Sequence, residues 1–345
     1  MIWIRADANR DIGTGHVMRC LSIAAALRRR GTQVCFLTAD EAALPLLEAR
    51  KQDYRVLHSD YKRPEEELET LEALLGGEKS GFFLADSYFM TKAYFDQVRH
   101  WMPAGYLDDL GQNVFPLDLL INYNIFAGSA LYGQRQDTRL LLGTAYAPLR
   151  EAFIRVPYEV RRKASRVLVT TGGSDRYNLA GQFLERALAN PDTAQLTYWV
   201  VSGAYNVHLE VLEALERTHE NIRIYTNVTN MQDLMRKSDI AVTAGGSTMY
   251  ELSAVGVPLL CFSFVDNQER IVEGFREREL TIFGGNYLTG GEAMLDELAE
   301  KLALLAEDFD LRRCSSRKLR QVVDGLGAER IAEVLEEMSR GKACM

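Results

Sequence analysis

Residues 2–40 decide the fold and read IWIRADANRDIGTGHVMRCLSIAAALRRRGTQVCFLTAD. They contain a short, mostly apolar run at 2–8 and a second one at 32–40. Between them, residues 16–31 place apolar side chains on one helical face and end in three arginines and Gly31, which are typical helix-stop signals. A strand, a glycine-containing loop, a helix and a strand in this order predict a βαβ unit with parallel strands.

The same alternation continues along the chain. Further strands are expected within 54–60, 81–87, 104–110, 117–124, 138–143, 166–175, 196–204, 222–227, 239–247 and 257–264. Helices are expected at 65–77, 91–102, 178–188, 207–218, 231–237 and 247–256, and the tail from 292 to 338 is mostly helical. Nearly continuous apolar strands that alternate with helices indicate an α/β protein with parallel sheets covered on both faces.

The chain of 345 residues is long enough for two domains. We expect two Rossmann-like, doubly wound domains at 1–150 and 165–345, joined near 146–163, with the helical tail in the second. Such sheets bind ligands at the carboxyl ends of their strands. Two facing domains of this kind would therefore enclose a cleft.

The composition excludes some function classes. A net charge of −8 argues against nucleic acid as a partner, because phosphate backbones favour basic surfaces. The five cysteines form no CxxC pair or Cys/His cluster, which indicates reduced thiols in an intracellular protein. No signal peptide or membrane-spanning apolar run is evident, so a cytoplasmic location is expected.

The loop Gly13-Thr14-Gly15-His16 precedes the first expected helix. A dinucleotide fingerprint would need a third glycine where Met18 stands, so an NAD site is disfavoured. What remains is a tight turn that presents backbone N–H groups and His16. The positive end of the helix dipole favours an uncharged imidazole, which suits a general base. The alternative is a histidine that only caps or packs.

Two glycine turns in the second half end strands and begin helices. Backbone N–H groups of such turns can hold a diphosphate. Their candidate residues are Gly172, Gly173, Ser174, Gly246, Ser247 and Thr248. Asn178 is expected to cap its helix. Glu251, one turn into the second helix, either binds a ribose diol or simply complements the helix dipole.

Polar residues follow two more strands. Asp86-Ser87-Tyr88 ends a strand of the first half, and Asp266-Asn267-Gln268 follows a strand of the second. Both could be ordinary turn formers. Asp108-Asp109 and Asp118 are acidic, but no His or third carboxylate stands at the spacing of a metal site. Neither a metal nor another cofactor is therefore expected.

At these residues the chain resembles a known family. The matching segments are RADANRDIGTGHVMRCLSIA, LADSYF, LDDLGQNVFPLDLLIN, GTAYAPLREAF, TTGGSDRYN, NVTNMQDLMRKSDIAVTAGGSTMYEL and FVDNQ, spread over roughly 1–290. G-x-G-H-x-x-R together with GG[ST]D and GGST-x-x-E is jointly specific. The sequence resembles the UDP-2,4-diacetamido-2,4,6-trideoxy-β-L-altropyranose hydrolases of pseudaminic acid biosynthesis, which have the GT-B fold and are related to MurG-type glycosyltransferases.

The resemblance implies hydrolysis of the anomeric C–O bond with inversion and release of UDP, without a metal. It implies that His16 accepts the proton, with Tyr88 and Asn267 assisting at the sugar. Asn178 and Glu251 would bind the UDP-sugar, and the backbone at 228–231 would hold uracil. The substrate and UDP set then comprises Gly13, Gly15, Gly172, Gly173, Ser174, Asn178, Met231, Gly246, Ser247, Thr248, Glu251 and Gln268. The helical tail after about 290 departs from the shorter relatives.

Three other functions remain open. A glycosyltransferase of the same fold would use the same UDP pocket but transfer the sugar to an acceptor hydroxyl. A catalytically inactive binding protein would hold the UDP-sugar without turnover. An NAD oxidoreductase is the most distant alternative. Fold alone does not separate these functions, because one scaffold hosts several chemistries.

Overall fold

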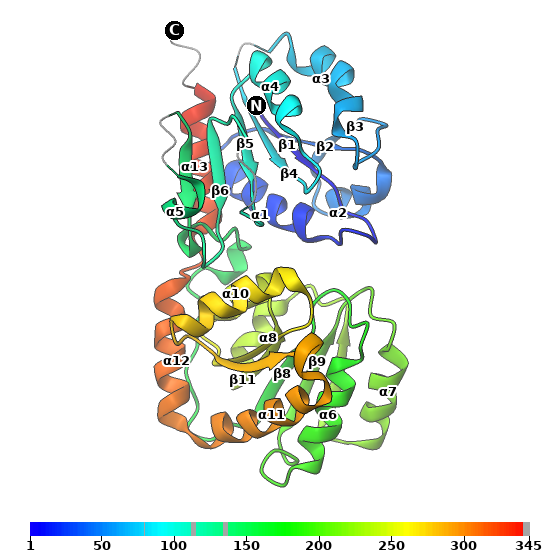
Figure 1. Cartoon of the computed structure of the whole chain (residues 1–345), viewed down its shortest axis with the longest axis vertical. Helices are drawn as coiled ribbons and strands as arrows, with labels where there is room; N and C mark the ends of the chain where they lie inside the picture. Colours follow the sequence, from blue (N-terminus) through cyan, green and yellow to red (C-terminus); the bar gives the residue numbers. More distant parts are fainter. Residues whose placement is uncertain (79, 112–114, 134–136, 341–345) are drawn as a thin grey trace. The chain divides into compact units, whose positions relative to one another are not determined.

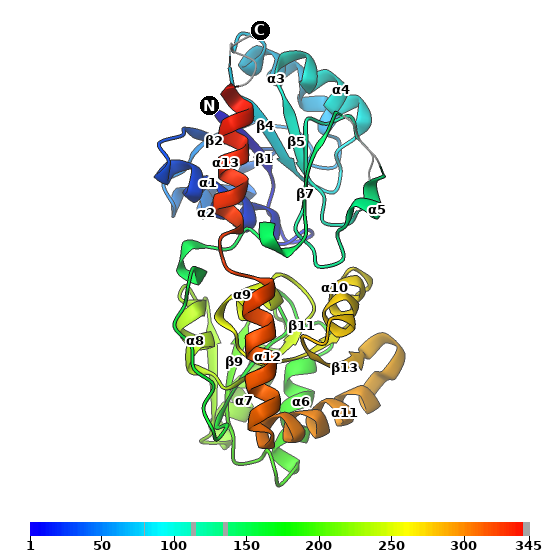
Figure 2. The ribbon, with the colours of Figure 1, turned by 90° about the vertical axis from the view of Figure 1, so that its left-hand side faces the viewer.

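The computed structural model describes residues 1–78, 80–111, 115–133 and 137–340. Residues 112–114 of the matching segment at 107–122 lie outside these ranges. The chain divides into two units, one made of Met1–Glu151 with Gly325–Met345 and the other of Ala152–Asp324 (Figures 1 and 2). Each unit is a parallel sheet with helices packed against it, as the alternation of apolar strands and helices predicts.

In the described part of the first unit, seven strands pair in the order β3-β2-β1-β4-β5-β6-β7, all parallel. They are β1 (Ile2–Ala6), β2 (Val34–Thr38), β3 (Asp53–Val56), β4 (Phe82–Asp86), β5 (Ala104–Leu107), β6 (Leu119–Asn122) and β7 (Arg139–Leu142). β1, β2 and β4 are buried along their whole length, which explains their unbroken apolar runs.

Most helices of this unit follow one of its strands along the chain, and the last one comes from a segment that follows the second unit. They are α1 (Gly15–Arg29), α2 (Leu44–Glu48), α3 (Leu68–Leu75), α4 (Lys92–Trp101), α5 (Ser129–Tyr132) and α13 (Gly327–Arg340), with short 3₁₀ turns at Glu41–Ala43, Pro64–Glu67 and Thr144–Tyr146. Another 3₁₀ turn, Glu151–Phe153, lies where the second unit begins. The G-x-G-H-x-x-R segment, residues 13–19, leads into α1, so the first turn of this helix lies beside the strand ends where ligands bind.

The second unit repeats the plan with six described strands in the parallel order β10-β9-β8-β11-β12-β13. The strands are β8 (Arg166–Thr170), β9 (Thr197–Ser202), β10 (Ile222–Thr226), β11 (Ile240–Ala244), β12 (Leu259–Ser263) and β13 (Ile282–Asn286). The helices are α6 (Leu179–Ala189), α7 (Leu209–Thr218), α8 (Met231–Lys237), α9 (Ser247–Val255), α10 (Asp266–Glu277), α11 (Tyr287–Glu307) and α12 (Phe309–Val322). α10 and β13 had no counterpart among the expected elements, since two glycines interrupt the apolar pattern of β13.

The assignment of the whole tail to the second domain is wrong for α13. This helix belongs to the first unit and packs along α1 (Figures 1 and 2). Glu336 of α13 accepts hydrogen bonds from Arg30 Nε at 2.9 Å and from the Thr32 hydroxyl. A Cβ on Gly327 would lie 2.1 Å from the Ala147 carbonyl oxygen, so only glycine permits this approach. Such tertiary contacts leave no periodic signal in the sequence.

Among the described helices, none combines the length and the apolar character that crossing a membrane requires.

Candidate active site

The first unit gathers polar side chains at the carboxyl edge of its sheet. After β1, the chain folds back on itself, and Gly13 N–H donates to the Asn9 carbonyl at 2.9 Å. Gly13 has a φ of +73°, which an L side chain adopts with strain. α1 then begins at Gly15, and Thr14 makes no side-chain cap. This tight turn places His16 in the first turn of the helix.

His16 is nearly buried, with 3% of its surface exposed, and its Nδ1 lies 2.6 Å from Asp86 Oδ1. Asp86 is the last residue of β4 and pairs in register with Ala6 at the end of β1. Burial alone would raise the pKa of Asp86, but the charges and hydrogen bonds of Arg19 and His16 outweigh burial and hold it well below its usual value. Asp86 is therefore a carboxylate that only accepts hydrogen bonds.

The protonation of the His16 ring follows from this contact. Because Asp86 carries no proton, the 2.6 Å contact requires the proton to be on Nδ1. In the uncharged ring, Nε2 then has the free lone pair and can accept a proton. The helix dipole is thus not the only influence on the ring, since a carboxylate lies directly against it.

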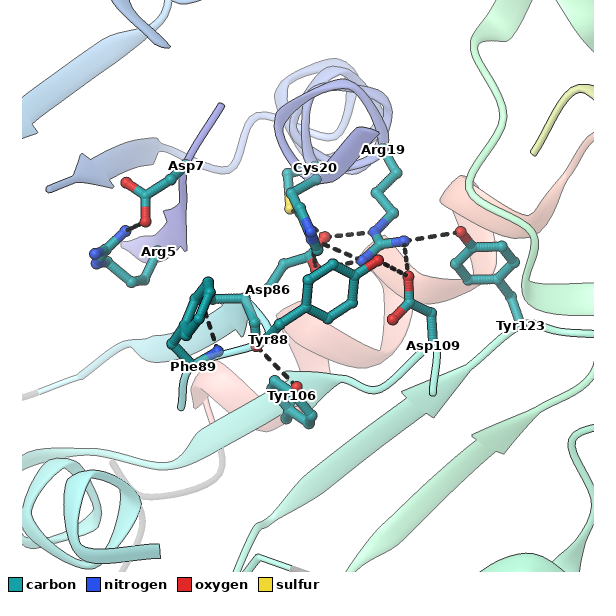
Figure 3. A network of polar contacts seen from close by, with 12 residues as sticks. Arg5, Asp7, Arg19, Cys20, Asp86, Tyr88, Phe89, Tyr106, Asp109 and Tyr123 are labelled. Carbon is teal, nitrogen blue, oxygen red and sulfur yellow. Dashed lines mark hydrogen bonds and ion pairs between the residues drawn. The ribbon is translucent and has the colours of Figure 1, made fainter. Parts of the chain in front are cut away.

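Arg19 connects this histidine–aspartate pair to a second carboxylate. Its Nε donates to Asp86 Oδ2 and its Nη2 to Asp86 Oδ1, both at 2.5 Å. Its Nη1 donates to Asp109 Oδ2 at 2.6 Å and to the Tyr123 hydroxyl at 3.1 Å. Figure 3 shows the guanidinium lying between the two carboxylates. The Arg19 side chain is only 12% exposed, so water has little access to these ion pairs.

Tyr88 lies against His16 on the same edge. The two rings meet edge to face with centroids 4.5 Å apart. The Tyr88 hydroxyl donates to Asp109 Oδ2 at 3.3 Å (Figure 3). Partial desolvation, followed by the charge of Asp109, raises the pKa of Tyr88 well above its usual value. The phenol therefore stays protonated and can donate a hydrogen bond. Tyr106 holds the loop by donating to the Ser87 carbonyl at 2.8 Å.

Of the residues expected in this half, the structure brings His16 and Tyr88 together beside the Gly13–Gly15 turn. Arg19, Asp109 and Tyr123 were not among the candidates for the site, and Asp86 was noted only as a strand-end residue. The available signal for Arg19 was its spacing, because residues i and i+3 share one helical face. Asp86 ends β4, whereas Asp109 and Tyr123 follow β5 and β6, and only the strand order reveals that these strands are neighbours.

In the second unit, the first glycine turn follows β8. Gly172 has a φ of +88°, and Gly172, Gly173 and Ser174 are exposed. Asn178 stands at the N-cap position of α6, but the expected cap by its side chain is wrong. Asp175 instead accepts hydrogen bonds from the N–H groups of Leu179 at 2.7 Å and Ala180 at 2.9 Å.

Asn178 plays a different part in this turn. It adopts a left-handed conformation with a φ of 55° and makes no cap hydrogen bond. Its Oδ1 is buried and has no hydrogen-bond partner within the described residues. An Asn at that position can tolerate positive φ, whereas the aspartate three residues earlier provides the acceptors that the helix needs.

Gly203, which follows β9, supports the same turn from the neighbouring strand. A Cβ on Gly203 would lie 2.2 Å from the Gly172 carbonyl oxygen and 2.4 Å from that of Gly173. Tyr205 N–H also donates to the Gly173 carbonyl at 3.0 Å. The shape of the turn therefore depends on a glycine that was not among the expected site residues.

The second glycine turn follows β11, with Gly246 at the N-cap of α9 and Ser247 as its first residue. Thr248 and the partly buried Glu251 lie within the following turn. A Cβ on Gly245 would lie 2.9 Å from Gln268 Cβ, so α10 packs closely on this turn.

The remaining candidates of this unit lie on α8 and α10. Gln268 Oε1 accepts a hydrogen bond from Phe264 N–H at 3.0 Å, which fixes the connection between β12 and α10. Asn267 is exposed on α10, and Met231 is the first residue of α8 with 9% of its surface exposed. All these segments follow carboxyl ends of one sheet. No group of three or more His, Cys, Asp or Glu within the described ranges has a geometry that could hold a metal ion.

The sequence of this chain is similar to several known proteins. Residues 167–271 match the glycosyltransferase family 28 C-terminal domain. The spore coat polysaccharide biosynthesis protein SpsG of Bacillus subtilis is 25% identical over 98% of each chain. The UDP-2,4-diacetamido-2,4,6-trideoxy-β-L-altropyranose hydrolase of Campylobacter jejuni is 25% identical over 78% of this chain and 93% of its own.

The fold also matches a solved structure over nearly the whole chain. The crystal structure of Acinetobacter baumannii MurG aligns with a TM-score of 0.70 and 14% identity, over 98% of this chain and 99% of that protein. Together with the two parallel sheets, this match establishes the two-domain α/β fold of the GT-B type.

Proposed function

We propose that the protein hydrolyses a UDP-activated 2,4-diacetamido-2,4,6-trideoxy sugar at the anomeric C–O bond and releases UDP, as a step of pseudaminic acid biosynthesis. The similarity to the Campylobacter jejuni hydrolase along most of both chains supports the substrate class. The match to the family 28 C-terminal domain supports a nucleotide-sugar ligand in the second unit.

The observation that carries the proposal is the His16–Asp86 pair. The lone pair of His16 Nε2 takes a proton from water while the water oxygen forms a bond to the anomeric carbon. The C–O bond to the diphosphate breaks, and UDP leaves with the bonding electrons. The Asp86 carboxylate, 2.6 Å from Nδ1, stabilises the imidazolium that forms. Attack opposite the leaving group inverts the anomeric centre.

We assign Tyr88 and Asn267 to the sugar, in line with the family that the sequence resembles. Tyr88 is suited to donate a hydrogen bond, because its raised pKa keeps the phenol protonated. Asn267 is exposed and has an amide that can both donate and accept.

We assign UDP to the second unit. The N–H groups of the two glycine turns, at Gly172–Ser174 and Gly246–Thr248, suit a diphosphate, whose charge helix N-termini stabilise. Glu251 is assigned to the ribose diol, Asn178 to the UDP-sugar, and Met231 with the preceding backbone to uracil. Because UDP is a good leaving group, positioning of water and stabilisation of the diphosphate charge supply most of the catalysis.

A glycosyltransferase is the second candidate, and the family 28 match and the MurG-like fold favour it. Such an enzyme would use the same base to activate an acceptor hydroxyl instead of water. Incubation of the protein with candidate UDP-diacetamido sugars, followed by NMR of free sugar and UDP, separates the two. Stoichiometric release of free sugar and UDP without any acceptor is the expected result, whereas an absolute requirement for an acceptor would establish a transferase.

Replacement of the base tests the assignment of His16. His16→Asn should abolish turnover, a loss on the order of 10²–10⁴-fold for a missing general base, because the amide cannot accept the water proton. UDP affinity, measured by calorimetry, should stay within about twofold of wild type, since the nucleotide is assigned to the second unit. Hydrolysis by this variant at the wild-type rate would show that His16 is not the base.

A further inference from the structure

Arg19 uses all three of its guanidinium nitrogens on side chains of its own unit. Nε and Nη2 engage both oxygens of Asp86, and Nη1 engages Asp109 and the Tyr123 hydroxyl. The two bonds to Asp86 form the parallel, bidentate arrangement that is the strongest contact between arginine and a carboxylate. An arginine held in this way has little capacity left for a diphosphate.

The spacing of His16 and Arg19 follows from their common helix. Residues three apart in α1 lie on one face, so the histidine and the arginine both reach Asp86 at the end of β4. Arg19 Nη2 and His16 Nδ1 both donate to Asp86 Oδ1, and the distance of 2.9 Å between these two nitrogens follows from their shared acceptor. By fixing the carboxylate, the guanidinium also limits the rotation of the ring that donates to it.

The charges of the cluster also have a direct consequence for proton transfer. With an uncharged His16, the cluster holds one cation, Arg19, and two carboxylates, Asp86 and Asp109. A proton on His16 makes the positive and negative charges equal in number. Without Arg19, two largely buried carboxylates would be left without their cation, and Asp86 would be free to turn away from the ring.

We propose that Arg19 is a positioning residue that joins the His16–Asp86 pair to the Asp109–Tyr88 pair, and that it does not bind the diphosphate. The base and the tyrosine hydroxyl are thereby held at fixed places on one sheet edge through a single shared guanidinium. This inference rests on the proposed hydrolysis, in which His16 is the base. In this inference, the arginine of G-x-G-H-x-x-R fixes the positions of His16 and Tyr88.

Arg19→Lys is the first test, because it keeps the charge and removes the bidentate fork. With the UDP-sugar that the wild type hydrolyses, we expect kcat to fall roughly 10²-fold, which is the scale of a misplacement of about 1 Å. KM and the dissociation constant of UDP should stay within about twofold, since the nucleotide site is untouched. In Arg19→Ala, added guanidinium chloride at millimolar concentration should restore part of kcat.

Arg28→Lys is the matched control on the same helix. Arg28 is exposed, and its guanidinium donates to the carbonyl oxygens of Arg50 and Lys51, so this variant should keep wild-type kcat. A crystal structure of the wild type with UDP supplies a measurement that does not depend on folding of the variants. In it, the Arg19 guanidinium should still contact Asp86 and Asp109.

The outcomes are distinct. A kcat of Arg19→Lys equal to wild type, a UDP affinity that falls together with kcat, or an Arg19 side chain turned onto the diphosphate would each overturn the inference. Failure of the wild type to hydrolyse any UDP-diacetamido sugar would instead contradict the proposed function, while the structure with UDP would still test whether Arg19 contacts the diphosphate.

Discussion

At the scale of the residue, Asp86 is subject to opposing effects of burial and charge, and it is the direct partner of the proposed base. It is buried, which disfavours its charge, yet it accepts hydrogen bonds from Arg19, His16 and the Cys20 thiol. A buried carboxylate is tolerated only when cations and donors compensate for lost water. Asp86 is thus both a structural anion and the group that selects the His16 tautomer.

Asp86→Asn should therefore lower kcat by about 10²–10⁴-fold, because the amide no longer selects the Nδ1–H form of the ring. UDP affinity should change little. The measurement is steady-state kinetics beside calorimetry of UDP. A variant with wild-type kcat would show that His16 does not need this partner.

The same substitution has a signature in the pH dependence of stability. The folded-state pKa of Asp86 is lowered, so its contribution to the free energy of unfolding is fully present above the unfolded value near 3.8 and is lost as the pH falls towards the folded value. Urea unfolding of the wild type at pH 7, 5 and 3 should show this loss. The loss in Asp86→Asn should be smaller between pH 5 and 3.

At the scale of the element, the loops after neighbouring strands support one another. The turn after β8 carries N–H groups that we propose to bind the diphosphate. The loop after β9 contacts this turn through Gly203 and Tyr205. Similarly, α10 packs on Gly245 after β11. Glycine is required at 203 because backbone approaches backbone there, and at 245 because side chains of α10 lie against it. The residue that faces a ligand is often not the one that shapes the loop.

Gly203→Ala should weaken UDP binding by roughly tenfold or more, because the new methyl group would displace the carbonyl groups of Gly172 and Gly173. Calorimetry with UDP measures the effect. Gly77→Ala is the control, since a Cβ there meets no atom within 4 Å. Equal UDP affinity in both variants would contradict a role for Gly203 in shaping the turn.

At the scale of the whole molecule, the first unit includes α13, a helix that follows the second unit in the sequence. α13 packs on α1, and Glu336 and Glu337 pair with Arg30 and Arg139. Leu335 of this helix is fully buried. The integrity of the helix that carries His16 and Arg19 thus depends on residues more than 300 positions later in the chain.

Leu335→Ala should destabilise the first unit by about 2–5 kcal/mol, the usual cost of a cavity at a buried leucine. Hydrogen exchange should become faster in α1 and α13, and exchange in β8–β13 should not change. Leu304→Ala is the matched control, because this leucine of α11 is 62% exposed and its loss should cost no more than about 0.5 kcal/mol. Uniformly faster exchange in both units would show that they unfold together.

The sequence by itself determined the α/β class, the two sheets and most of their strands and helices, because apolar periodicity and helix-stop residues act locally. It also singled out His16, Tyr88 and the glycine turns, whose positions after strands imply the ligand edge of a parallel sheet. Hydrolysis, and the roles assigned to these residues, stay predictions until turnover is measured.

Only the tertiary structure decided which side chains meet. The strand order brings Asp86, Asp109 and Tyr123 to the side of α1 that bears Arg19, although these residues are up to about a hundred positions apart. It gave the cap of α6 to Asp175 in place of Asn178, and it placed α13 in the first unit. Local patterns report which face of an element is buried, whereas a buried charge is stabilised by partners that only the packing of distant segments supplies.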